Sequence, residues 1–174
     1  MTGRDDIQAR DIQALLDKQA ITEQIHRYCR AVDRLDIPLG HSVWHEDATA
    51  EYGGGYYSGR GRDVIDRICA DHRKLLRHSH QIANILIELR GDTAGSESYV
   101  TATLQGLRGE TPFQITTCSR YVDRWSRRDG RWALDHRMAI RDFDEMRDIS
   151  GLSADPLSRR DAKDPSYAVL RAQP

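Results

Sequence analysis

The spacing of apolar residues along the chain changes about half-way from a helical period to a period of two. Apolar side chains recur three or four positions apart within residues 7–35 and again within residues 62–76. This spacing predicts two amphipathic helical regions, the first being one long helix or two in tandem. Pro38 is typical of a first helical turn and predicts a short helix between them.

The second half of the chain is β-rich. Residues 48–52 predict a short strand, and the three glycines that follow favour a hairpin leading into residues 56–61. Apolar and polar residues then alternate over four long segments, 80–89, 98–107, 113–125 and 131–143. The separators combine glycine with charge, as antiparallel turns do. Helices followed by such a meander predict an α+β fold, with helices on one face of a curved antiparallel sheet.

The length of 174 residues is that of one domain, which we expect over residues 1–150. Residues 151–174 are rich in Ser, Asp, Pro and Arg and have few apolar residues. This C-terminal tail can wrap its own domain, form an arm on a neighbouring subunit, or be disordered.

The charge balance and the apolar runs exclude several classes of partner. The chain has 26 Lys plus Arg against 27 Asp plus Glu, which gives no reason to expect nucleic acid or an anionic membrane. The apolar runs are much shorter than the roughly 20 residues of a membrane span, and the N-terminus does not have the pattern of a signal peptide. We therefore expect a cytoplasmic protein.

No motif for a metal or a cofactor stands out. The three cysteines are widely separated and odd in number, which supports neither a disulfide framework nor a CxxC site. His78 and His80 would share a strand face, and His41 and His45 a helix face, but neither pair has a third ligand at a recognised spacing. The glycine-rich segment 53–61 does not have the Lys-Ser/Thr ending of a phosphate loop. We expect no metal and no cofactor.

Several short segments resemble a known family: IHRYCRAVD at 25–33, WHEDA at 44–48, HQIAN at 80–84, and YVDRW with DGRW between 121 and 132. Over Ile12 to Phe143 the chain is similar to the SnoaL-like branch of the nuclear transport factor 2-like superfamily. The resemblance implies a cone-shaped barrel, in which a strongly bent antiparallel sheet wraps around N-terminal helices and leaves a deep pocket. Many members dimerise or trimerise, so it also implies a homodimer or homotrimer.

Within that superfamily the residues are most similar to the group of hexachlorocyclohexane dehydrochlorinase, scytalone dehydratase and bile-acid 7α-dehydratase. The resemblance implies that His80 is a catalytic base and that Asp33 orients it. Tyr28 stands where the dehydratases have a tyrosine, and Arg137 where the dehydrochlorinase has a functional arginine. The bile-acid enzyme has a further aspartate near the positions of Thr101 and Thr103, and this departure leaves the leaving-group side of the reaction open.

The chemistry of an elimination asks for the same residue types. A histidine can take a proton near neutral pH, and a carboxylate on its other ring nitrogen fixes the tautomer. A tyrosine can donate to a leaving hydroxyl, and an arginine can stabilise developing negative charge. Each residue also has a structural interpretation: His80 as a hydrogen-bonded structural histidine, Asp33 as a polar helix-end residue, and Tyr28 as a core residue.

The face on which Arg137 lies depends on the register of its strand. Strict alternation puts Arg137 on the face opposite Trp132 and Leu134, so it joins them only if a bulge intervenes. Without a bulge, His136 is the alternative pocket residue.

The expected pocket lining is mainly apolar and aromatic with a few polar points. The candidate binding residues are Trp44, Tyr56, Ile82, Asn84, Thr101, Thr103, Phe113, Ile115, Thr117 and Met138. Such a lining suits a small hydrophobic ring compound: a steroid, terpenoid, polyketide, or aromatic or halogenated intermediate.

The sequence thus favours a cofactor-independent lyase or isomerase of the dehydratase type that uses His80 and Asp33. Two alternatives remain. The chain can be the non-catalytic small (beta) subunit of a ring-hydroxylating dioxygenase, or a hydrophobic-ligand-binding protein without turnover.

Overall fold

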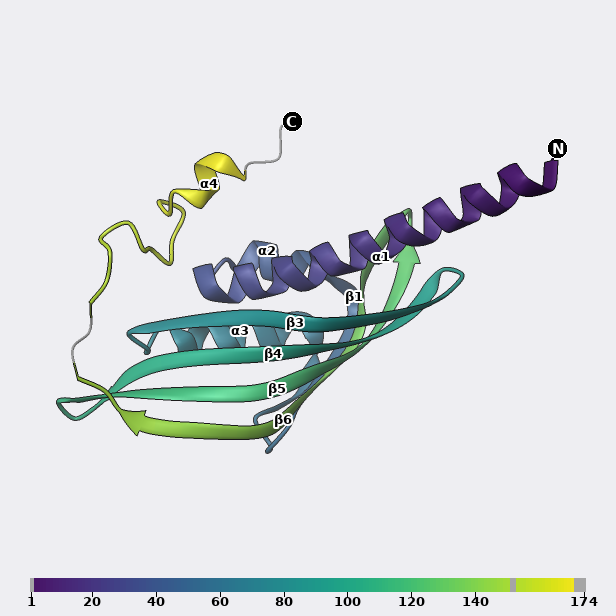
Figure 1. The fold of residues 1–174 in the computed structure, drawn as a ribbon. Coiled ribbons are helices and arrows are strands. Elements are labelled where there is room, and N and C mark those ends of the chain that lie inside the picture. Colours follow the sequence, from purple (N-terminus) through teal and green to yellow (C-terminus); the bar gives the residue numbers. More distant parts are fainter. Residues whose placement is uncertain (1, 151–152, 171–174) are drawn as a thin grey trace.

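A curled, unclosed six-stranded sheet with helices on its inner face makes up the fold (Figure 1). The computed structural model describes residues 2–150 and 153–170. The helices are α1 (Thr2–Arg34), α2 (Ile37–Ser42), α3 (Gly61–His72) and α4 (Ser166–Val169), and the strands are β1 (Trp44–Tyr52), β2 (Tyr57–Arg60), β3 (Arg77–Arg90), β4 (Thr93–Arg108), β5 (Thr111–Arg128) and β6 (Arg131–Asp148). The expected α+β class, with N-terminal helices and a bent sheet, is confirmed.

The strand order β2-β1-β6-β5-β4-β3 contains the predicted meander, β3 to β6. Each of its turns has a glycine at positive φ: Gly91, Gly109 and Gly130, at 62° to 75°. The pairing of β1 with β6 differs from the antiparallel expectation, because these strands run parallel. Residues distant in the sequence meet there, and no local pattern reports their relative direction.

The helix α1 buries only part of its apolar stripe. Ile21, Ile25 and Val32 are fully buried against the sheet, whereas Leu15 and Leu16 are exposed. Figure 1 shows the reason: the first turns of α1 extend beyond the sheet edge. The predicted helix over this region is confirmed as a single helix.

The short helix α2 begins next to a side-chain cap. The carboxylate of Asp36 accepts a hydrogen bond from the backbone N–H of Leu39 at 3.0 Å, and Pro38 lies in the first turn. Both features stabilise a helix start, and the predicted helix at Pro38 is confirmed.

A β-bulge in β6 decides which residues face the helices. Trp125 of β5 pairs with Leu134, whereas the adjacent Arg124 pairs with His136, so Asp135 is the extra residue. The bulge reverses the alternation, and Arg137 joins Leu134 on the buried face. The alternative that His136 faces inward does not hold.

The described part of the tail packs on its own domain. Arg30 of α1 donates to the hydroxyl of Ser166 at 2.9 Å, and the hydroxyl of Tyr167 donates to Asp36 at 2.7 Å. Of the three possibilities for the tail, the described residues 153–170 thus show contact with the same chain.

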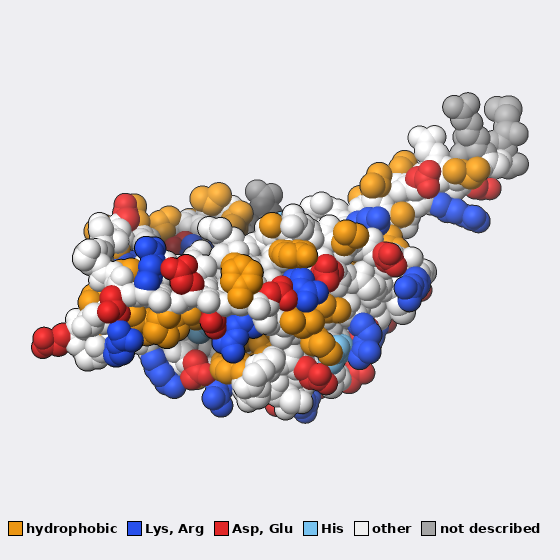
Figure 2. All heavy atoms as spheres, turned by 60° about the horizontal axis from the view of Figure 1, so that its bottom comes forward, with side chains coloured by type: hydrophobic (Ala, Val, Ile, Leu, Met, Phe, Trp, Pro, Cys, Tyr) orange, Lys and Arg blue, Asp and Glu red, His pale blue; other side chains and the backbone are white. Residues whose placement is uncertain are grey.

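The opposite face of the sheet, seen in Figure 2, mixes apolar and charged side chains. Leu86, Tyr99 and Phe143 are exposed at 64%, 45% and 67%. The expected homodimer or homotrimer stays a prediction. Among the helices that the structure describes, none is both long and apolar enough to cross a membrane.

Close packing at the start of α3 yields the first prediction. A Cβ on Gly61 would lie 2.1 Å from Cε3 of the fully buried Trp44 ring. Gly61→Ala should therefore lower the free energy of unfolding by about 1–3 kcal/mol, the usual cost of overpacking a core. Urea denaturation measures the change.

Gly95→Ala is the matched control, because a Cβ there would have no heavy atom within 4 Å. Its effect should stay within about 0.5 kcal/mol. An equal loss of stability in both variants would contradict this account of the packing.

Candidate active site

A cavity of about 570 Å³ opens between the inner face of the sheet and the helices α1 and α3. Its size is typical of small-molecule sites, which run from roughly 300 to 1,000 Å³. Its lining residues are Tyr28, Tyr52, Gly53, Gly54, Tyr56, Ile68, Asp71, His72, Leu75, His80, Val100, Ala102, Leu104, Thr117, Ser119, Tyr121, Ala139, Ile140 and Arg141.

His80 and Asp33 form a hydrogen-bonded pair beside this cavity. Nδ1 of His80 lies 2.7 Å from Oδ1 of Asp33, and the backbone N–H of His80 donates to Oδ2 at 3.0 Å. Both side chains are largely buried, with exposed fractions of 8% and 15%. Because both carboxylate oxygens are engaged, the ring is held at Nδ1, and Nε2 makes no hydrogen bond to a described residue.

The pair joins two elements that are distant in the sequence. Asp33 lies in the last turn of α1, and His80 lies near the start of the edge strand β3. A carboxylate at a helix C-terminus opposes the helix dipole and needs compensation. The two hydrogen bonds from His80 supply it, and they also fix α1 on the sheet.

Two tyrosine hydroxyls meet at another part of the cavity wall. The hydroxyl of Tyr28 lies 2.5 Å from that of Tyr52. Burial raises the pKa of Tyr28 well above its usual value, and burial also raises the pKa of Tyr52. Both phenols therefore stay protonated at neutral pH. One proton serves the bond between them, which leaves the other for a ligand in the cavity.

Arg137 lies behind the tyrosines and does not line the cavity. Its guanidinium donates to both carboxylate oxygens of Asp123, at 2.8 and 2.7 Å, and both side chains are fully buried. The guanidinium carbon lies 4.2 Å from the ring centroid of Tyr28 and 3.9 Å from that of Tyr121. Any influence on a ligand would pass through these rings.

Two further histidines surround His80. The ring of His72 lies 5.7 Å from that of His80 and 4.4 Å from that of His78. Burial, followed by the neighbouring charges of His78 and His80, lowers the pKa of His72 to about 3. No three residues with His, Cys, Asp or Glu side chains form a metal-binding cluster in the described part of the chain.

Some of the candidate binding residues line the cavity and others lie elsewhere in the core. Tyr56 and Thr117 line it, as do the catalytic candidates Tyr28 and His80. The Trp44 ring is fully buried beneath Gly61, and Ile82 packs against the core. Phe113 and Ile115 alternate with Thr117 on the inner face of β5 but lie outside the cavity, with Phe113 next to Gly106.

Four candidate binding residues have positions that differ from the expected ones. On β4 the residues Val100, Ala102 and Leu104 line the cavity, so the alternation places Thr101 and Thr103 on the outer face. The bulge in β6 likewise turns Met138 outward, where it is 39% exposed. Asn84 is exposed at an irregular point of β3, with φ at 49°.

Among the cavity residues that the sequence did not indicate, two lie next to the catalytic candidates: Tyr52 beside Tyr28, and His72 beside His80. Tyr52 is the last residue of β1, and His72 is the last residue of α3. The position of His72 on the apolar stripe of its helix indicated that it is buried, but no pattern indicated that its ring lies next to those of His78 and His80. For Tyr52 no local pattern indicated that it meets Tyr28.

Comparisons with solved structures support the fold. Kfla4162 from Kribbella flavida matches with a TM-score of 0.69 and 18% identity, over 76% of this chain and 95% of its own. A hexachlorocyclohexane dehydrochlorinase, LinA-type3 from Novosphingobium barchaimii LL02, matches with 0.68 and 20%, over 84% and 99%. A scytalone dehydratase-like protein from Novosphingobium aromaticivorans matches with 0.67 and 20%, over 84% and 96%.

At these identities the structural matches show the common fold and leave the activity open. A comparison with curated proteins finds no match. The SnoaL-like domain model matches residues 13–138, most of the chain and all of its sheet up to the middle of β6. The chain has the cone-shaped fold of the nuclear transport factor 2-like proteins and belongs to the SnoaL-like domain family.

Proposed function

We propose that this protein is a cofactor-independent lyase that removes a leaving group and a neighbouring proton from a small, cyclic, largely apolar substrate. The observation that carries the proposal is the His80–Asp33 pair at the wall of a mainly apolar cavity that opens to the surface. An elimination requires a base, and a histidine whose Nδ1 is held by a carboxylate, and whose Nε2 makes no hydrogen bond to a described residue, can act as one.

The proton is abstracted by His80. Asp33 accepts the Nδ1–H bond, so the lone pair of Nε2 is free to take a proton from a substrate carbon. The electron pair of that C–H bond forms the new double bond, and the imidazolium that results is stabilised by the Asp33 carboxylate. A buried ion pair of this kind gains strength from the low dielectric of the cavity.

The leaving group departs at the tyrosine pair. It takes the electrons of its bond to carbon, and Tyr28 or Tyr52 donates a hydrogen bond or a proton to it. Burial raises the pKa of both tyrosines, and the positive charge of Arg137 beneath the rings acts in the other direction and lowers it. Arg137 is therefore a positioning residue in this proposal, and the imidazolium proton returns to the tyrosine pair or to solvent after product release.

The substrate class follows from the lining. Ile68, Val100 and Leu104 supply apolar surface, while Thr117 and Ser119 add single hydroxyls. A hydrophobic ring bearing a hydroxyl or halide next to an acidic C–H suits this wall, and the dehydrochlorinase and dehydratase-like proteins that share the fold are consistent with such a reaction.

The proposal is tested with a panel of cyclic β-hydroxy and β-halo carbonyl compounds and halocycloalkanes, followed by mass spectrometry. Asp33→Asn should lower kcat by at least about 100-fold, because an amide that donates to Nδ1 forces the proton onto Nε2. His80→Gln should lower kcat at least as much. Substrate binding should change far less, since both side chains act on the proton.

His26→Gln is the matched control, because His26 is exposed on α1 away from the cavity. It should leave kcat unchanged. Tight binding of panel compounds without any turnover would favour a ligand-binding protein instead, and full activity in His80→Gln would exclude His80 as the base.

The lowered pKa of His72 predicts how stability depends on pH. Its pKa is about 3 in the folded state and roughly 6.5 in the unfolded chain. Between these values the unfolded state binds a proton that the folded state does not. The free energy of unfolding should therefore fall with decreasing pH below about 6.5, by up to about 1.4 kcal/mol per pH unit for this one group.

Urea unfolding in steps from about pH 7 to about pH 5 measures this slope. His72→Gln should reduce the slope without abolishing it, because burial also lowers the pKa of His78. His26→Gln should leave it as in the parent protein. An unchanged slope in His72→Gln would show that His72 is not kept neutral by the fold.

A further inference from the structure

A second hollow, of about 420 Å³, lies between the tail, the end of α1 and the start of β3. We call it the tail cleft, and its lining residues are Arg34, Leu76, Arg77, His78, Ser79, Thr103, Gln105, Ser158, Arg159 and Arg160. It shares none of these residues with the cavity that holds His80. Four of them are arginines and none is acidic. What the cleft can bind therefore depends on how many of these arginines are paired with carboxylates from outside the cleft.

Two of the four arginines are neutralised by carboxylates of the tail. Arg34 lies 3.3 Å from Oδ2 of Asp164. Arg159 donates to both oxygens of Asp161, at 3.0 and 2.6 Å. These two guanidiniums therefore do not require a further anion.

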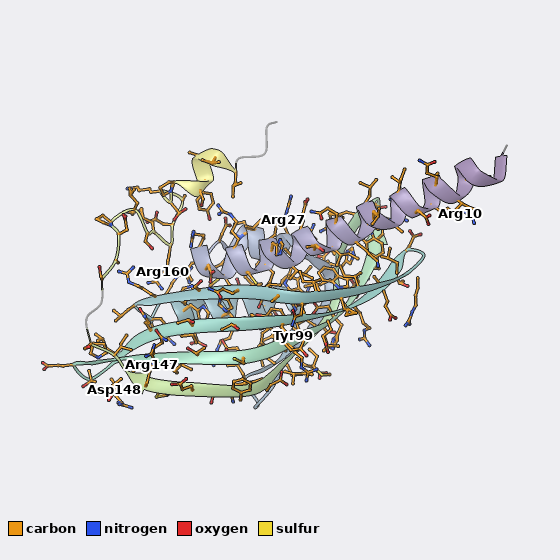
Figure 3. All side chains as sticks on the ribbon, in the orientation of Figure 1. Arg10, Arg27, Tyr99, Arg147, Asp148 and Arg160 are labelled. Carbon is orange, nitrogen blue, oxygen red and sulfur yellow. The ribbon has the colours of Figure 1, made fainter. Side chains whose placement is uncertain are left out.

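Arg160 is held in place without being neutralised. It donates to the carbonyl oxygens of His72 and Leu75, at 2.9 and 3.0 Å, and lies 3.3 Å from Nδ1 of His78. All three acceptors are uncharged if Nε2 of His78 carries its proton, as its 3.0 Å contact to the carbonyl oxygen of Val32 requires. Arg160, itself a residue of the tail, is labelled in Figure 3.

Arg77 is the second uncompensated cation. Within residues 2–150 and 153–170 its side chain makes no hydrogen bond or ion pair, although it is only partly exposed. Burial, followed by the charge of Arg77, lowers the pKa of Arg160. Both arginines line the same cleft, so an anion bound there would be attracted by both positive charges and would reduce the repulsion between them.

We propose that the tail cleft binds a dianionic oxyanion of the phosphate class between Arg77 and Arg160. Two uncompensated positive charges match a dianion, whereas a carboxylate would leave one of them unpaired. Guanidinium groups bind phosphate oxygens through paired N–H donors, and the hydroxyls of Ser79 and Ser158 lie in the same wall.

The bound anion would also hold the tail against β3. Arg160 belongs to the tail and Arg77 to β3, so one ligand would bridge them. The cleft has more volume than a single phosphate needs, which leaves room for a phosphate ester or a diphosphate. Binding should therefore stabilise the folded chain, and the stabilisation should grow with the logarithm of the anion concentration once that concentration exceeds Kd.

Isothermal titration calorimetry of the full chain tests the proposal, with inorganic phosphate, sulfate, pyrophosphate and acetate at matched ionic strength. Phosphate and sulfate should bind one per chain, and acetate should bind more weakly. Tighter binding of pyrophosphate would indicate a phosphate ester or diphosphate as the ligand, and equal binding would indicate the free anion. No saturable binding of any dianion would overturn the proposal.

Arg77→Gln should weaken phosphate binding at least about tenfold, because it removes one of the two charges without touching the contacts that hold the tail. The matched control is Arg147→Gln. Arg147 is exposed on β6, which β5 and β4 separate from β3, and is labelled in Figure 3. Equal phosphate affinity in Arg77→Gln and the parent protein would also overturn the proposal.

Discussion

The burial of one positive charge is the constraint on which the rest of this structure depends. Arg137 is fully buried, and a charge in such a place costs several kcal/mol unless it is paired. Asp123 accepts two hydrogen bonds from it, while the rings of Tyr28 and Tyr121 cover its faces. The bulge at Asp135 turns Arg137 inward, so the strand irregularity, the ion pair and the aromatic packing depend on one another.

Arg137 lies behind Tyr28 and Tyr121, two residues of the cavity wall, and holds their rings in place. Tyr28 is held between Arg137 on one side and the hydroxyl of Tyr52 on the other, so its phenol points where a ligand can reach it. The His80–Asp33 pair is built independently, by the end of α1 docking on the edge strand β3. The proposed acid and the proposed base therefore belong to separate elements that line one cavity, which is the arrangement that the proposed elimination needs.

The elements were predictable because their patterns are local, whereas the contacts between them were not. Alternation and glycine-bearing turns predicted the four long strands, but the parallel pairing of β1 with β6 has no local signal. Arg137 and Met138 were both predicted to lie in the pocket, but adjacent residues of a strand face opposite sides of the sheet. The bulge at Asp135 decides that Arg137 faces inward and Met138 outward. His80 and Asp33 were predicted through the family resemblance, while Tyr52, a lone tyrosine at a strand end, offered no pattern to find.

The most direct test of the account is the tautomer of His80, read from the ¹⁵N chemical shifts of its ring by NMR at a pH where the ring is neutral. The account predicts a proton on Nδ1, bonded to Asp33, and a bare Nε2. It also predicts that Asp33→Asn shifts the proton to Nε2. A proton on Nε2 in the parent protein would contradict the account, because the ring would then have no base to offer the cavity.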